Sequence, residues 1–265
     1  MNDNELFALN QQGFIPAPEE SEEDFLQRVS AAKNFFASPD DFFQGMQKVP
    51  DLDWDWARHR LKDLYDFQPF SAIAYYSNVK LTPWQAAASW IIDVRPGPLC
   101  AIQLRKRFNK GSYLGLYSRD EILAHEAVHA ARCAFNEPAS EEFFAYFTSN
   151  VKWRRVLGPI VQRPWEVFFF FGACLIGAFL GSFWPAISLL AVAFIRLSRQ
   201  HLKFRRAANT LSKAIAKPEH IRAVLFRLTD EEIKKLSQGE FIQHDGSLRH
   251  RMIQRYLIDD KKNSN

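Results

Sequence analysis

Residues 118–147 read SRDEILAHEAVHAARCAFNEPASEEFFAYF, and the predicted fold is built outward from this stretch. Its centre is His125-Glu126-Ala127-Val128-His129. Two histidines four residues apart lie on one face of an α-helix, so their imidazoles can bind the same metal ion. The glutamate between them is placed to act on a metal-bound water. The spacing therefore predicts a helix that binds a metal ion and holds a carboxylate beside it.

The sequence around the two histidines favours a helix. Ser118-Arg119-Asp120-Glu121 has the pattern of a capping box, in which Ser118 accepts from a free backbone N–H and Glu121 reaches back. Alanines, which favour helix and leave a thin back for close packing, recur at positions 124, 127, 130, 131 and 134. We therefore expect a capped helix whose alanine face lies against neighbouring elements.

A zinc site needs a third protein ligand, and the segment after this helix contains three glutamates. Glu137 lies in the connecting turn, whereas Glu141 and Glu142 lie early in a second predicted helix over residues 139–150. Pro138 suits the first turn of that helix because its missing N–H has no partner there in any case. The spacing alone leaves the choice between the glutamates open.

The two predicted helices resemble those of the gluzincin metallopeptidases, whose third zinc ligand is a Glu on a later helix. In several of those families a small residue follows that Glu by three positions, as in Glu142-Phe143-Phe144-Ala145. The short connection between the helices is most similar to the minimal members, the minigluzincins. The resemblance implies Zn²⁺ as the cofactor and Glu141 as the second candidate ligand. The implied ligand set is His125, His129 and Glu142.

A zinc-bound water also needs groups that move its proton and stabilise the oxyanion. Glu126 is assigned as the general base, which takes the proton and delivers it to the leaving amine. Tyr146 or Arg132 is assigned to the oxyanion. Tyr146 stands where thermolysin-type members carry an Asp, so the resemblance supplies no partner for His125. Arg132 has two further readings, a clamp on Glu141 or a substrate carboxylate, and a partner for the helix dipole.

The residues before the metal helix predict a small α+β region. In gluzincins an exposed edge strand there holds the substrate extended, and either of the last two predicted strands could serve. Residues 1–18 are expected to be a loosely ordered lead-in. Thr82-Pro83-Trp84-Gln85 has the pattern of a capping box that opens a helix to about Ile92. The other predicted elements are helices at 19–36 and 51–65 and strands at 71–81, 99–104 and 113–117.

Charge and cysteine content bear on the partners and the cellular compartment of the protein. The net charge of +4 gives no nucleic-acid footprint, and its distribution is uneven. Residues 1–60 carry twelve acidic and five basic side chains, whereas residues 196–265 carry eight acidic and sixteen basic ones. Three scattered cysteines make no disulfide framework and favour a reducing compartment. The first residues have neither a basic start nor an apolar run, so no signal peptide is expected.

A second strong signal is Val167–Ile195, which contains no charged residue. Its 29 residues exceed the roughly 20 needed for one membrane crossing. Gly181, Ser182 and Pro185 interrupt it in the middle, and basic residues flank both ends. Under the positive-inside rule this pattern predicts a membrane hairpin with both ends in the cytoplasm. Each arm is short, so a re-entrant or shallow hairpin is one alternative. One kinked single span and a buried helical hairpin of a soluble protein are the others.

These observations predict an α+β fold in three parts. The three predicted parts are a zinc-peptidase-like catalytic domain at 1–155, a transmembrane helical hairpin at 164–197 and a helical, basic C-terminal region at 198–265. The predicted function is a membrane-anchored zinc-dependent peptidase with its catalytic domain in the cytoplasm. Its expected partners are a peptide or protein substrate and membrane lipid, with no nucleic acid.

The alternative is a membrane scaffold or adaptor in which zinc only staples two helices. A structural site recruits a fourth protein ligand, whereas a catalytic site keeps that position open. Cys133, one helical turn after His129, is the candidate fourth ligand in that interpretation, and Glu141 is another group that could crowd the metal.

Overall fold

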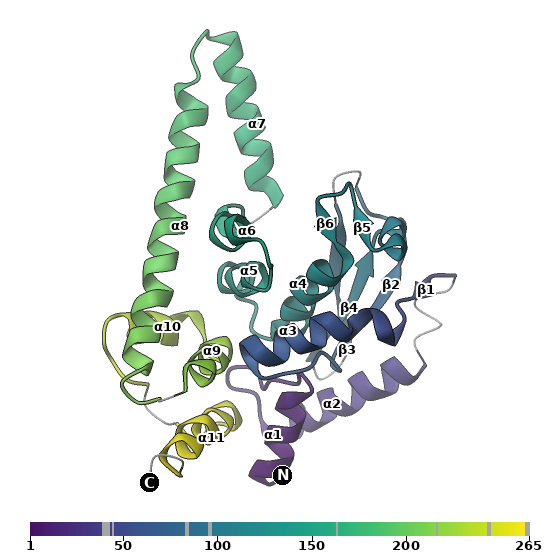
Figure 1. The fold of residues 1–265 in the computed structure, drawn as a ribbon, viewed down its shortest axis with the longest axis vertical. Coiled ribbons are helices and arrows are strands. Elements are labelled where there is room, and N and C mark those ends of the chain that lie inside the picture. Colours follow the sequence, from purple (N-terminus) through teal and green to yellow (C-terminus); the bar gives the residue numbers. More distant parts are fainter. Residues whose placement is uncertain are drawn as a thin grey trace.

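The computed structural model describes residues 1–262 except 39–42, 44, 83–84, 95–96, 163, 216 and 243–244. The fold is α+β, as predicted, with many helices and a small mixed sheet (Figure 1). The helices are α1 Asp3–Gln11, α2 Glu22–Ala37, α3 Asp55–Tyr65, α4 Arg119–Arg132, α5 Pro138–Phe147, α6 Lys152–Leu157, α7 Pro164–Phe179, α8 Trp184–Leu211, α9 Pro218–Phe226, α10 Asp230–Ser237 and α11 Leu248–Lys262. Short 3₁₀ turns are η1 Asp51–Trp54, η2 Lys106–Lys110 and η3 Gly158–Ile160.

The four-stranded sheet has the order β1-β2-β4-β3. Its strands are β1 Gln47–Lys48, β2 Ile73–Tyr76, β3 Ala87–Val94 and β4 Gly97–Leu104. β2 and β4 are parallel, whereas β1 with β2 and β3 with β4 pair antiparallel. β3 therefore has one strand neighbour and forms an edge, while β4 is internal. A separate ribbon of β5 Ser112–Tyr113 and β6 Tyr117–Ser118 leads directly into α4.

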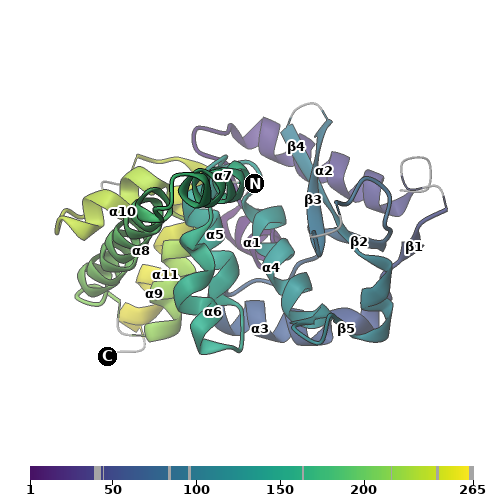
Figure 2. The same ribbon diagram turned by 90° about the horizontal axis from the view of Figure 1, so that it is seen from above.

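Helix α4 lies between the sheet on one side and α5 on the other (Figure 2). The predicted alanine face explains this position, because Ala124, Ala127, Ala130 and Ala131 are all buried. Small side chains let the neighbouring elements approach the helix closely. The metal helix is thus a central element of the core and has support on both sides.

Two expectations about the N-terminal half were wrong. Residues 1–18 contain α1, which begins with a complete capping box between Asn2 and Glu5. Leu6, Phe14 and Ile15 are buried in the core shared with α11, so this segment is well anchored. The local sequence of residues 1–18 does not reveal their contacts with α11, a helix some 240 residues further along the chain.

The predicted helix from Thr82 to Ile92 is instead a turn followed by strand β3. The local cap contact does form, since the Gln85 side chain accepts from the Thr82 backbone and hydroxyl at 2.9 Å. Pairing of β3 with β4 along its whole length then overrides that local signal. Pro83 and Trp84 lie outside the described residues.

The region at 164–197 forms two helices and the region at 198–262 is largely helical, as the sequence predicted. α7 and α8 run antiparallel and project from the rest of the molecule, with their turn at 180–183, where the interruption was expected (Figure 1). α8 continues through residue 198 to Leu211, where it packs against α10. One buried cluster joins residues from α1 to α11. The division into three parts stays a prediction.

The hairpin carries most of the exposed large apolar side chains of the described chain. Within the described residues, no single helix combines the length and the apolar composition of a membrane span. One bent pair, Lys152–Ile160 with Trp165–Phe179, meets both requirements together, with an angle of 79° between its two parts.

Candidate metal centre

Helix α4 begins where the sequence predicted, and its first turn is tied to the segment after α5. Ser118 is the N-cap and accepts from the Glu121 backbone N–H at 3.3 Å. The Glu121 side chain does not reach back to complete a capping box. It accepts instead from the Asn150 backbone and from Arg154, both at 2.8 Å. These bonds fix α4 relative to the α5–α6 connection.

The structure brings the three predicted ligands together. One ligand atom from each of His125, His129 and Glu142 lies within 4.8 Å of the other two. The Glu142 oxygens lie 3.8 Å from His125 Nε2 and 3.7 Å from His129 Nε2. Ligand atoms about 2.1 Å from a tetrahedral ion are about 3.4 Å apart, close to these separations. The donor set and its spacing therefore fit one Zn²⁺ ion.

Glu141 and Glu142 have different tasks at this site. Glu142 faces the Nε2 atoms of both histidines, whereas Glu141 Oε2 lies 3.5 Å from His129 Nδ1, on the far side of that ring. The other Glu141 oxygen accepts from the Glu137 backbone at 3.1 Å. Such a contact fixes the tautomer and orientation of a ligand histidine. The geometry thus favours Glu142 as the ligand and Glu141 as its support.

Glu126 has a partner that the sequence interpretation missed. Ser89 on edge strand β3 donates to Glu126 Oε2 at 2.6 Å. Burial raises the pKa of the Glu126 carboxyl, and His129 and Ser89 partly offset that effect. The β-forming residues of Trp90-Ile91-Ile92 were the signal for this strand, but the local cap pattern took precedence in the prediction. Of the two strands expected to offer an edge, 99–104 is the internal strand β4, and 113–117 is divided between β5 and β6 of the separate ribbon; β3 is instead an edge of the sheet.

Tyr146 lies against the first histidine. Its ring is 4.8 Å from the His125 ring, at an interplanar angle of 78°. A second neighbour is Gly158, where an added Cβ would overlap the Tyr146 ring. Contacts with His125 and Gly158 therefore set the position of this ring. The backbone of Ala145 lies near His125 and partly offsets the effect of burial on the pKa of this histidine.

Arg132 and Cys133 are not available to the site in the ways considered. Arg132 is fully buried and donates to the carbonyls of Phe226 and Leu228 and to Glu137. It joins α4 to the C-terminal helices and cannot reach a substrate or an oxyanion. The Cys133 thiol lies 3.7 Å from the Pro98 carbonyl and is not one of the grouped ligand residues.

The charges at the site suit a cation. Burial, with help from His129, lowers the pKa of His125 to about 3, so this imidazole is in the neutral form that binds metal. Burial raises the pKa of Glu142 to about 7. For His129 burial alone would lower the pKa, but the hydrogen bond to Glu141 and nearby carboxylates outweigh it and raise the pKa to about 9. Carboxylates crowded beside two histidines are favoured by a bound divalent ion.

Ser89 and Gly158 are the two residues of this region that sequence reasoning did not single out. Neither belongs to a recognised spacing, because each acts by lying against a residue on another element. Comparisons of the chain with protein-family models, curated proteins and solved structures gave no match.

Proposed function

We propose that this protein is a membrane-anchored, zinc-dependent peptidase of the gluzincin type. One observation carries the proposal: Glu142 faces the Nε2 atoms of His125 and His129, and Glu126 lies beside them with a fixed partner. When bound, zinc would lower the pKa of a water toward about 7 and polarise the scissile carbonyl.

Glu126 is the proton carrier in this proposal. Ser89 occupies its Oε2 atom at 2.6 Å, which leaves Oε1 to accept a proton from water. Its raised pKa helps the carboxyl to hold that proton and release it to the leaving amine. Tyr146, whose ring contacts the His125 ring, is the proposed oxyanion donor.

The free edge of β3 gives the substrate a place to bind. An extended peptide can pair with an exposed strand edge through main-chain hydrogen bonds. Because Ser89 of the same strand contacts Glu126, a peptide paired there passes close to the proton carrier. The proposed substrate is therefore an extended segment of a peptide or protein.

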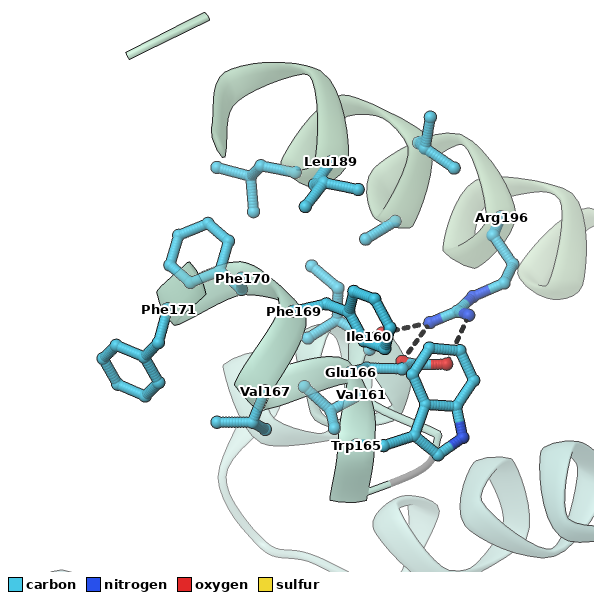
Figure 3. A pocket seen from close by; sticks show the side chains of 13 residues that line it. Ile160, Val161, Trp165, Glu166, Val167, Phe169, Phe170, Phe171, Leu189 and Arg196 are labelled. Carbon is cyan, nitrogen blue, oxygen red and sulfur yellow. Dashed lines mark hydrogen bonds and ion pairs between the residues drawn. The ribbon is translucent and has the colours of Figure 1, made fainter. Parts of the chain in front are cut away.

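The α7–α8 hairpin supports the membrane anchor. Figure 3 shows the apolar groove of about 520 Å³ between the two helices, lined by aromatic and aliphatic side chains. The charged lining residues, Glu166 and Arg196, pair with each other at 2.7 Å, and Arg196 also donates to the Ile160 carbonyl at 2.6 Å. With 16 residues, α7 is about 24 Å long, shorter than a hydrocarbon core of about 30 Å. These dimensions favour a shallow hairpin.

The topology is tested by labelling single cysteines at Arg155 and Arg206 in sealed vesicles. Both positions lie at the root of the hairpin, so a water-soluble thiol reagent is expected to reach them from the same side. Labelling from opposite sides would establish the single-span alternative. Labelling from both sides in protein that washes off the vesicles would remove the anchor from the proposal.

The scaffold alternative requires a closed metal site. Among the described residues, the group that can hold a metal has three members, and Cys133 points to the Pro98 carbonyl. A site with an open fourth position favours catalysis over a structural staple.

The proposal is tested by zinc analysis of the purified protein together with a peptide-library digest, with and without a chelator. Cleavage that is lost with the chelator and regained with zinc supports the peptidase. Stoichiometric zinc with no cleavage across a broad library would instead establish the staple.

A further inference from the structure

A second concavity lies behind the metal site, between α5, α8 and α9. Its volume is about 240 Å³, and its lining includes Phe143, Phe204, Arg205 and Arg222. The α5 residues that line it are near Glu142 in sequence, but His125, His129 and Glu142 themselves do not line the pocket. This α5–α8–α9 pocket is therefore separate from the metal centre and shares one helix with it.

The walls of the pocket are aromatic and well fixed. The Phe143 and Phe204 rings stack with centroids 4.0 Å apart and an interplanar angle of 6°. Phe144 meets Phe204 edge to face at 5.1 Å, and its carbonyl accepts from the buried Tyr65 hydroxyl at 2.7 Å. With the wall's polar groups already bonded, the interior suits an apolar body, such as a ring or a few methylenes.

The rim of the pocket is cationic. Arg205 and Arg222 are exposed, and in the part of the chain that the structure describes neither has a carboxylate within ion-pair distance. Arg60 lies near Arg155 and Arg222. The pKa of Arg60 is lowered mainly by burial, and these two like charges lower it further. The guanidinium groups of Arg205 on α8 and Arg222 on α9 thus line one aromatic hollow, and Arg60 on α3 adds positive charge near Arg222.

This combination selects an amphiphilic anion. A guanidinium group presents a planar fork of donors that matches phosphate oxygens, and two such groups can bind a dianion from different directions. Like charges gathered around a concave, low-dielectric surface also concentrate anions near it. A purely apolar ligand would leave the arginines without a role, and a free ion would leave the aromatic wall unused.

We propose that the α5–α8–α9 pocket binds an organic phosphate with an apolar body. The phosphate group lies between Arg205 and Arg222, and the apolar body lies against Phe143 and Phe204. A soluble phosphate ester and the headgroup of an anionic phospholipid share this chemistry. The site does not depend on the proposed peptidase activity.

The test is equilibrium binding to the purified full chain. The soluble probes are phenyl phosphate and inorganic phosphate, and the membrane probes are phosphatidylcholine vesicles with and without phosphatidic acid. The variants are Arg205→Gln and Arg222→Gln. Arg206→Gln is the matched control, because Arg206 is the exposed neighbour of Arg205 on α8 and does not line the pocket.

We expect each pocket variant to weaken binding of phenyl phosphate about tenfold or more, since hydrogen bonds to charged groups contribute that much. The control should stay within about twofold, and phenyl phosphate should bind more tightly than inorganic phosphate. Binding of the soluble ester identifies a soluble ligand, whereas binding to phosphatidic acid vesicles alone identifies a headgroup. Equal losses for Arg205→Gln and Arg206→Gln, or no binding of any phosphate probe, overturns the proposal.

Discussion

The metal site and the α7–α8 hairpin use their side chains in opposite ways. At the site, Glu126 accepts from Ser89 and Glu141 contacts His129, so the geometry is set by the fold itself. On the hairpin, Phe168, Phe169 and Phe171 are each 60% exposed or more. Large exposed apolar surfaces mark places where another surface binds. Single substitutions are therefore expected to disrupt the site, whereas the role of the hairpin depends on the surface that covers its exposed side chains.

The largest expected effect separates proton transfer from metal binding. Glu126→Gln should keep zinc and lower peptide hydrolysis by about 10²–10⁴-fold, because it removes the proposed general base. His125→Ala should lose both zinc and hydrolysis, because it removes a ligand. Zinc content, thermal stability and cleavage are measured on the same preparations. Loss of zinc from Glu126→Gln would contradict the assigned role, and so would unchanged hydrolysis.

The next effect distinguishes the ligand from its support. Glu141→Ala removes the partner of His129 Nδ1, a change that typically lowers metal affinity by about 10–100-fold. Glu142→Ala removes the proposed ligand and should weaken zinc binding further. Competition with a chromophoric chelator gives both affinities. Equal losses, or a larger loss at Glu141, would reverse the two assignments.

Sequence patterns were sufficient for the parts of the site that act through local spacing. The cap at Ser118, the four-residue repeat of histidines and the Pro138 start of α5 each predicted what the structure contains. Ser89 could not be found in this way, because it reaches Glu126 only after β3 has paired with β4. The position of Ser89 depends on the pairing of β3 with β4, which overrides the helix that the local cap at Thr82 predicted.

The same reason explains the missed start of the chain. The apolar residues of 1–18 are interrupted by Pro16 and Pro18 and show no clear period. They become ordered by contacts with distant residues, such as the hydrogen bond from Asn10 to Tyr256 at 3.2 Å. By contrast, the break in the apolar run at Gly181 is a local backbone feature, with φ of +64°, and the sequence predicted it correctly.

The C-terminal end of α8 packs on α10 and is buried, whereas the part of α8 near the hairpin turn is mostly exposed. This end offers a further test of the contrast between buried, bonded residues and the exposed hairpin. On α10, Glu232 accepts from Arg249 at 2.7 Å and from His250 at 2.9 Å. Burial alone would raise the pKa of Glu232, but these bonds outweigh it and lower the pKa to about 2. The bond to Glu232 raises the pKa of His250, against the effect of burial.

These pKa shifts predict a stability maximum between about pH 4.5 and 6.5, the ordinary pKa values of the two groups. Below it, protonation of Glu232 removes up to about 3 kcal/mol of the free energy of unfolding as the pH falls toward 2. Above it, stability from protonated His250 is lost as the pH rises through its raised pKa. Denaturation across pH checks this. Glu232→Gln should flatten the fall of stability at low pH, whereas Glu231→Gln, on the exposed side, should retain it. An identical fall in both variants would refute the role of the bonds from Arg249 and His250 to Glu232.

The smallest effect compares one glycine of the site with one of the hairpin. At Gly158 an added Cβ overlaps the Tyr146 ring, and this ring also contacts the His125 ring, so it has little room to move. Gly158→Ala should therefore cost about 1–3 kcal/mol, as overpacking does, and should also lower hydrolysis by displacing Tyr146. Gly172 lies inside α7 with nothing within 4 Å of the added Cβ. Gly172→Ala should stabilise the helix by up to about 1 kcal/mol.

Chemical denaturation of both variants gives the two changes with opposite signs. Tyr146→Phe controls for the hydroxyl, because it keeps the ring packed between Gly158 and His125 and removes only the proposed oxyanion donor. If displacement of the ring is the cause, Gly158→Ala lowers both stability and hydrolysis, whereas Tyr146→Phe lowers hydrolysis with little change in stability. Changes of the same sign at the two glycines would mean that the site is no more tightly packed than the hairpin, and the comparison would fail.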